Sequence, residues 1–205
     1  MREKNHIPSG EEYAWEALTK LKCNDVCHRA RVNYDNTSGY YTLKSFGQYI
    51  YISLKDKKIF NPSPESYLRN HELRQLSIIS ILWYLMNAKA IPLLGTLVKP
   101  CDLTGGQIYQ AGSHVLPLYK IAEKYNNNMQ EFLTKGATYG AKALHFGDAS
   151  LQFYPFPRIP VTLLLWKGDR EFSARADILF DATCDLHLPG DIVWSVAMMS
   201  IMIML

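Results

Sequence analysis

Apolar positions at the start of the chain recur with the period of a helix and then change to the period of a strand. Ala14, Leu18 and Leu21 fall on one stripe at helical spacing. Further along, apolar and polar positions alternate, as in residues 48–54, and polar turn residues at 35–39 interrupt the alternation. The first part of the chain therefore predicts helices at 10–22 and 24–31, and then antiparallel strands within 32–43, at 48–54 and at 58–60.

A proline-rich segment at residues 61–64 separates this unit from the rest of the chain. The longest predicted helix follows at 65–88, and its second half is apolar on nearly all sides, as in a buried central helix. Residues 146–181 contain three apolar runs divided by Gly and Pro turn residues, which predicts a three-strand meander. The remaining predictions are an irregular stretch at 91–112, helices at 116–125 and 128–139, and a last helix at 191–205.

These elements predict an α+β fold and not a doubly wound parallel sheet, because the strands come in neighbouring hairpins. We expect an antiparallel sheet formed by the N-terminal hairpin unit and the C-terminal three-strand meander, with flanking helices. Neither half alone has enough strands for a well-covered sheet. Residues 1–205 are therefore expected to form a single α+β domain, and any sub-boundary is expected near 61–65.

Composition and charge argue against several classes of protein. Of the 205 residues 48% are hydrophobic and 20% charged, as in ordinary globular proteins. The net charge is only +3 and the basic residues are scattered, so no nucleic-acid-binding face is expected. The longest apolar runs, at 76–86 and 192–205, are shorter than the ~18–20 residues that span a bilayer. No apolar segment of a secretory signal is present at the start, so we expect a cytoplasmic protein with reduced thiols.

No catalytic or ligand-binding signature of known chemistry occurs in the sequence, so no catalytic residue is predicted. Cys23 and Cys27 resemble half of a metal site, but a closed zinc site needs four ligands, and Cys101 and Cys184 lie far off in single positions. An iron–sulfur cluster bound by four thiolates usually requires three of the cysteines to lie close together in the sequence. We therefore interpret the thiols as small buried hydrophobic groups and predict no metal ligands.

His145 lies three positions before Asp148, at a predicted strand turn. A histidine near a carboxylate is able to act as a metal ligand, as a general base or as an axial ligand to a tetrapyrrole. The simpler alternative is a partly exposed residue at the end of a strand.

Arg158 lies between Pro157 and Pro160, whose rings stiffen the backbone and would aim the arginine in a fixed direction. Such an arginine could receive a carboxylate or a phosphate. Internal pairing with Asp148 or Asp181 is the reading that we favour.

The segment from Trp166 to Glu171 is the third candidate for a binding site, with Trp166, Asp169 and Glu171 close together. Two carboxylates at a hairpin tip could bind a divalent ion, but a hard cation such as Ca²⁺ is usually coordinated by six or more oxygens from an ordered loop. Gly168 and Asp169 are also good turn residues, because glycine accepts positive φ and aspartate bonds to the backbone that follows it. The turn reading is therefore favoured.

The last predicted helix, at 191–205, is rich in methionine, which fills irregular gaps in cores and adapts to varied partners. Core packing is the first reading. If Met199, Met202 or Leu205 is exposed, the helix becomes a surface for a protein partner or for self-association.

Several motifs together resemble a known family. They are Leu103-Thr104-Gly105-Gly106 with Tyr109, Gly147-Asp148-Ala149-Ser150, Phe156-Pro157-Arg158-Ile159-Pro160, Leu165-Trp166-Lys167-Gly168-Asp169 and Ile178-Leu179-Phe180-Asp181. They resemble the uncharacterised family of anaerobic bacteria and archaea called domain of unknown function 3786, some members of which carry a label as PAS/PAC sensors. The resemblance implies an anaerobic setting and an association with corrinoid or iron–sulfur proteins, and it supplies no catalytic residues.

The leading hypothesis is a non-catalytic cofactor- or partner-binding module of anaerobic metabolism. The rival hypothesis is a metal-dependent enzyme or accessory factor with a pocket around His145, Asp148 and Arg158. Geometry separates the two, because the rival needs these three side chains to converge in one concave pocket.

Overall fold

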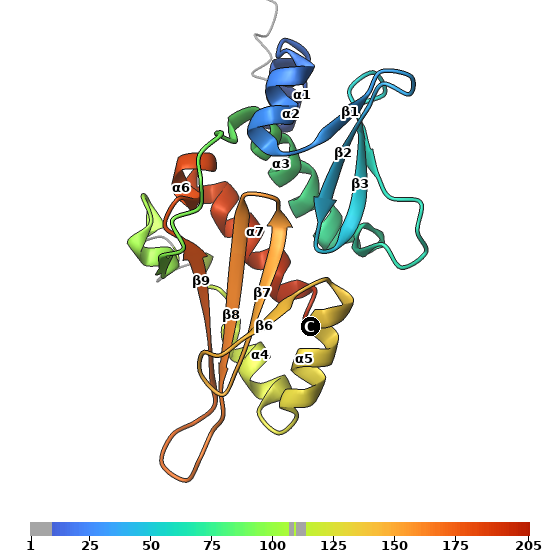
Figure 1. Ribbon diagram of the computed structural model, residues 1–205. Coiled ribbons are helices and arrows are strands. Elements are labelled where there is room, and N and C mark those ends of the chain that lie inside the picture. Colours follow the sequence, from blue (N-terminus) through green and yellow to red (C-terminus); the bar gives the residue numbers. More distant parts are fainter. Residues whose placement is uncertain (1–9, 107–108, 110–113) are drawn as a thin grey trace, which may run out of the picture.

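Two antiparallel sheets and the helices around them make up the fold, seen in a computed structural model that describes residues 10–106, 109 and 114–205 (Figure 1). The first sheet has the strand order β1 (Asn33–Asp35), β2 (Tyr40–Ser45), β3 (Gln48–Ser53), β4 (Lys58–Phe60). The second has the order β5 (Leu97–Val98), β9 (Arg175–Asp181), β8 (Ile159–Trp166), β7 (Ala149–Phe156), β6 (Lys142–Leu144). The helices are α1 (Gly10–Thr19), α2 (Cys23–Ala30), α3 (His71–Asn87), α4 (Leu118–Tyr125), α5 (Met129–Thr138), α6 (Cys184–His187) and α7 (Gly190–Met202), with short 3₁₀ turns η1 (Tyr67–Arg69) and η2 (Pro100–Asp102).

The predicted α+β class, with antiparallel strands and flanking helices, is confirmed. The arrangement differs in one respect: the hairpin unit and the meander form two sheets instead of sharing one. The first unit has the strands that the sequence indicates, and the second adds the short strands β5 and β6 to its meander, so that each has enough strands for a sheet of its own. The domain prediction for 1–205, with its sub-boundary near 61–65, stays a prediction.

The two sheets meet at the turn between β2 and β3. The backbone N–H of Phe46 donates to the carbonyl of Tyr154 at 2.9 Å, and the buried Phe46 ring packs on Phe153. Gly47 has φ +76°, and a Cβ there would lie 3.2 Å from the backbone nitrogen of Gly140. Glycine is required at this contact both by the left-handed backbone of Gly47 and by the close approach of the two backbone segments.

Helices cover the five-stranded sheet and bury its central strands. α4 packs on β8 and β9, α5 on β6 and β7, and α7 lies between β7 and α3. Seven of the eight residues of β8 are buried, as expected for a strand covered on both faces. The buried apolar side chains of both sheets and of the helices form one connected cluster.

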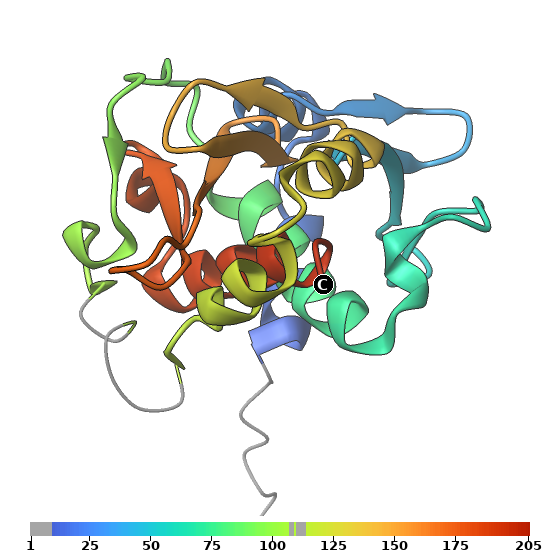
Figure 2. The same ribbon diagram turned by 90° about the horizontal axis from the view of Figure 1, so that it is seen from below.

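The last helix, α7, belongs to this core. Met199 is fully buried and Met202 half-buried, while Leu205 remains 43% exposed. Lys124 in α4 fixes the end of the chain, because its ammonium donates to the carbonyls of Met204 at 3.0 Å and Leu205 at 2.7 Å. Figure 2 marks this C-terminal end beside the helices that cover the second sheet. Core packing therefore accounts for most of this helix, and docking or self-association through 191–205 stays a prediction. None of the helices in the described ranges has both the length and the apolar character to cross a membrane.

Candidate functional site

All the predicted site residues except Arg158 gather at one end of the five-stranded sheet. This "hairpin end" consists of the β6–β7 turn, residues 145–148, and the β8–β9 loop, residues 167–174, which extends beyond the helices (Figure 1). The meander brings the two loops together because β7 and β8 pair from Ala149 and Leu165 onward. His145, Asp148, Asp169 and Glu171 are all exposed there.

Asp148 joins the two loops of the hairpin end. Its carboxylate accepts the backbone N–H of Lys167 at 2.8 Å, and its own N–H donates to the carbonyl of Leu165 at 3.1 Å. His145 lies nearby on the exposed side of the same turn. Asp148 therefore has a structural task that explains its position without a ligand.

Trp166 is the last residue of β8, and its indole makes one hydrogen bond and one cation–π contact. Its indole N–H donates to the carboxylate of Asp177 at 3.1 Å, and the guanidinium of Arg175 lies 4.8 Å from the ring centroid. An arginine over a tryptophan face is a favourable cation–π pair. The ring is thus fixed by β9 and half-buried.

Asp169 shapes the β8–β9 loop. Its carboxylate accepts the backbone N–H groups of Phe172 and Glu171, both at 2.8 Å. These two hydrogen bonds, Phe172 first, lower the pKa of the exposed Asp169 carboxyl. This is the turn chemistry expected of an aspartate, and Glu171 contributes its backbone to it.

A cavity of about 530 Å³ opens beside this loop, against α4. Its wall contains two aromatic side chains, Tyr119 and Phe172, that are 59% and 70% exposed. Two carboxylate residues, Glu123 and Asp169, also line it. Sequence reasoning missed both aromatic residues, although a phenylalanine within a polar turn was a usable signal for Phe172.

Arg158 lies at the opposite end of β7 and β8 from His145 and Asp148, in the turn between the two strands. Eight residues of extended strand separate the two ends, roughly 26 Å at the usual rise per residue. The structure therefore does not bring Arg158 to the other two residues of the rival pocket.

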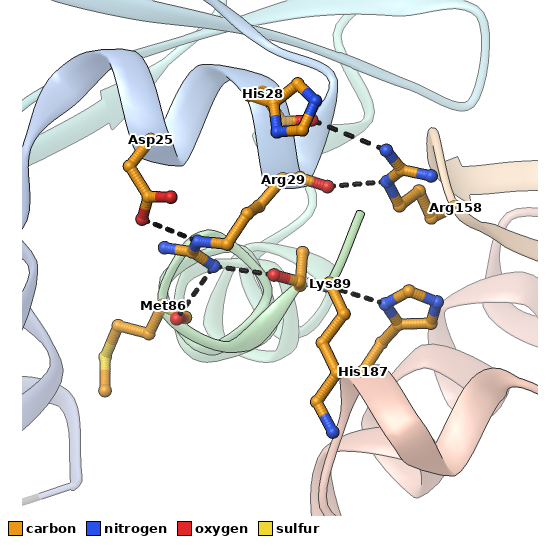
Figure 3. Close-up of polar contacts among 8 residues, drawn as sticks. Asp25, His28, Arg29, Met86, Lys89, Arg158 and His187 are labelled. Carbon is orange, nitrogen blue, oxygen red and sulfur yellow. Dashed lines mark hydrogen bonds and ion pairs between the residues drawn. The ribbon is translucent and has the colours of Figure 1, made fainter. Parts of the chain in front are cut away.

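The partners of Arg158 are backbone carbonyls (Figure 3). Its guanidinium donates to Arg29 at 2.5 Å, to Ile91 at 2.7 Å and to His28 at 3.4 Å, and the whole residue is only 7% exposed. The predicted pairing with Asp148 or Asp181 is replaced by these contacts, because the open carbonyls at the end of α2 lie within its reach. Burial, together with the nearby Arg31, lowers the pKa of the guanidinium.

Arg29 binds the C-terminal end of α3 in the same way as Arg158 binds the C-terminal end of α2 (Figure 3). Its guanidinium donates to the carbonyls of Ala88 at 2.6 Å and Met86 at 3.2 Å at the end of α3, and it also pairs with Asp25 at 2.7 Å. The two arginines thus connect the β7–β8 turn, α2 and α3 through helix C-termini, where positive charge is favourable.

Asp181 is the last residue of β9, at the end of the strand that lies away from the hairpin end. It is buried, and its carboxylate accepts the N–H groups of Leu94 at 3.3 Å, Gly95 at 2.7 Å and Thr183 at 3.0 Å, and the Thr183 hydroxyl at 2.6 Å. Burial raises the pKa of this carboxyl, but the donors, Thr183 first, outweigh it and leave the pKa lowered.

His187 is the one buried histidine of this region. It is 1% exposed, and its Nδ1 accepts the backbone N–H of Lys89 at 3.1 Å (Figure 3). Its Nε2 has no hydrogen-bond partner in the described structure. Burial first, and then the charges of Arg158 and Lys89, lower its pKa to about 4, so the ring is neutral at pH 7.

His187 is expected to make the fold sensitive to mild acid. In the unfolded chain a histidine titrates near pH 6.5, so the unfolded state binds the extra proton first and stability falls between pH 7 and the folded pKa of about 4. The free energy of unfolding should drop by about 2 kcal/mol between pH 7 and pH 5 from this group alone. His187→Asn keeps an acceptor for Lys89 and cannot titrate, so urea unfolding should show a smaller loss for the variant. Equal losses in both proteins would contradict this account.

Side chains that bind metals do not converge in the part of the chain that the structure describes. No group of three or more His, Cys, Asp or Glu residues there is placed to hold a metal ion. All four thiols are free; Cys184 is buried, while Cys23, Cys27 and Cys101 are partly exposed, more so than the prediction of buried thiols implied. Burial, and then the adjacent Cys23, raise the pKa of Cys27.

Comparison with known proteins identifies the family and nothing finer. Neither the curated proteins nor the solved structures gave a match to the chain. Residues 22–202, which include both sheets, the hairpin end and Arg158, match the family described as "Domain of unknown function (DUF3786)". The chain therefore belongs to the DUF3786 family.

Proposed function

We propose that this protein is a non-catalytic, cytoplasmic binding module of anaerobic metabolism, and that it receives its partner or cofactor at the hairpin end. The observation that carries the proposal is the cavity of about 530 Å³ with the exposed rings of Tyr119 and Phe172 in its wall. Exposed aromatic side chains around a hollow are typical of a docking site, because they supply apolar area with few rotamers to fix.

The polar residues of the fold support a binding role over a catalytic one. Arg158, Arg29 and Asp181 each use their charge to hold backbone groups. Asp148 and Asp169 hold the loops of the hairpin end in the same way. These charged groups stabilise the frame on which the cavity is built.

The partner class follows from the family resemblance. We propose a corrinoid or iron–sulfur protein as the partner, which would dock over Phe172 and Tyr119. The metal-dependent alternative around His145, Asp148 and Arg158 has less support, because Arg158 lies at the far end of the strands from the other two.

The test is purification of the protein under anaerobic conditions from cells that express it, with visible absorption and elemental analysis for cobalt and iron. We expect a co-purifying protein with a corrinoid or cluster spectrum, and its recovery should fall at least tenfold in the Tyr119→Ser and Phe172→Ser variants. Tyr49→Ser is the matched control, because Tyr49 is similarly exposed, at 57%, but lies on β3 of the other sheet. Recovery of a colourless protein without partner, or equal loss in the control, would refute the proposal.

A further inference from the structure

A second cavity, of about 480 Å³, lies on the other side of the fold, between the edge strand β4 and the start of α3. Three basic side chains line it: Arg69, His71 and Arg74. Its other walls are apolar or neutral, and they consist of Ile59, Phe60, Asn61, Ser66 and Leu68. Among the described residues, none that lines this "basic cavity" is acidic. Its volume falls within the usual range for small-molecule sites, ~300–1,000 Å³.

Two exposed arginines give the basic cavity its positive charge. Neither Arg69 nor Arg74 forms an ion pair with a carboxylate in the described chain. Their situation contrasts with that of Arg29, which pairs with Asp25 at 2.7 Å. A hollow lined by one sign of charge concentrates the field and attracts an ion of opposite sign. The N-terminus of α3, near His71 and Arg74, contributes the positive end of the helix dipole, and the one carboxylate of this first turn, Glu72, is exposed and does not line the cavity.

The loop that carries Arg69 is held in place before any ligand arrives. Asn61 accepts the N–H of Ser63 at 2.8 Å, and Ser66 accepts the N–H of Leu68 at 3.3 Å. Arg69 itself donates from Nε to the carbonyl of Ser63 at 3.4 Å. This contact orients the guanidinium, and its two terminal nitrogens have no partner among the residues that the structure describes, which leaves them available for the fork-like geometry that suits carboxylates and phosphates.

We propose that the basic cavity binds a small organic anion, a phosphate ester or a carboxylate, between Arg69 and Arg74, with His71 as a further polar contact. Ile59, Phe60 and Leu68 supply the apolar wall against which the body of the ligand lies. The site does not depend on the hairpin end, since it is built from β4, η1 and α3.

The test is an NMR titration of the full chain at constant ionic strength with phenyl phosphate, benzoate and the uncharged benzyl alcohol. At least one of the two anions should shift the backbone amides of residues 66–74 in a saturable way, and which one does so distinguishes phosphate esters from carboxylates. Arg69→Gln and Arg74→Gln should each weaken that binding at least tenfold. Both residues are exposed, so these variants are expected to fold.

The matched control is Arg170→Gln, which removes one exposed positive charge at the hairpin end and leaves the basic cavity intact. Its affinity for the anion should stay within twofold of the unmodified chain. Absence of saturable binding by both anions, equal binding of benzyl alcohol, or an equal loss in Arg170→Gln would each overturn the proposal.

Discussion

Arg158→Ala is expected to lower the free energy of unfolding by about 3–4 kcal/mol. The substitution removes the donors that satisfy the carbonyls of His28, Arg29 and Ile91, and these partly buried carbonyls are left without a protein donor beneath the β7–β8 turn. A buried polar group without a partner costs more than an average hydrogen bond contributes. Equilibrium unfolding in urea, followed by the fluorescence of the tryptophans, gives the value.

Two further variants distinguish the role of the branched guanidinium of Arg158, with its several N–H donors, from the role of positive charge alone. Arg158→Lys keeps the charge but offers a single ammonium group, which cannot reach three carbonyls at once, so an intermediate loss is expected. Arg170→Ala removes an exposed arginine from the β8–β9 loop and should change stability by no more than about 0.5 kcal/mol. An Arg158→Ala protein as stable as the Arg170→Ala protein would show that the carbonyl contacts do not hold α2 in place.

Arg158 also shows where reasoning from the sequence reaches its limit. The flanking prolines correctly indicated an arginine with a fixed direction. Its target was out of reach of the sequence, because the acceptor, the carbonyl of Arg29, lies 129 positions away along the chain. Every residue carries a carbonyl, so no residue type along the chain marks this partner.

The longer elements were predictable because their periodicity extends over several turns or several strand residues. The strands β7 and β9 follow Gly-Asp turns, and β8 follows the turn at Pro157 and Arg158. β4, although it has only three residues, was predicted with the bounds that it has, because a short polar turn joins it directly to β3. β5 and β6, with two and three residues, were missed because such short segments carry no period of their own. They become strands only because they pair with the edges formed by β9 and β7.

The basic cavity was missed for a related reason. The sequence predicted one helix over 65–88, whereas the side chain of Asn70 accepts the N–H of Leu73 and caps α3, which begins at His71. That cap separates Arg69, in the preceding turn, from Arg74 on the helix. The change of direction at the cap allows both arginines to line the same cavity. The uninterrupted helix that the sequence predicted gave no indication of such a cavity.

Asp181→Ala is expected to be at least as damaging as the loss of Arg158, at about 3–5 kcal/mol of unfolding free energy. Its carboxylate is the acceptor for donors from Leu94, Gly95 and Thr183, and without it the loop before β5 loses its attachment to the end of β9. Asp181→Asn should recover part of the loss, because one amide oxygen remains to accept hydrogen bonds.

The pH dependence distinguishes this role from simple packing. The pKa of Asp181 is lowered in the folded state, so its contribution is complete above the unfolded value, near 4, and is lost as the pH falls through the folded value. The difference in stability between the unmodified chain and Asp181→Ala should therefore shrink below about pH 4. Glu171→Ala, an exposed carboxylate in the β8–β9 loop, should show little loss at pH 7. A difference for Asp181→Ala that stays constant down to pH 3 would mean that packing, and not the charged carboxylate, fixes the loop before β5.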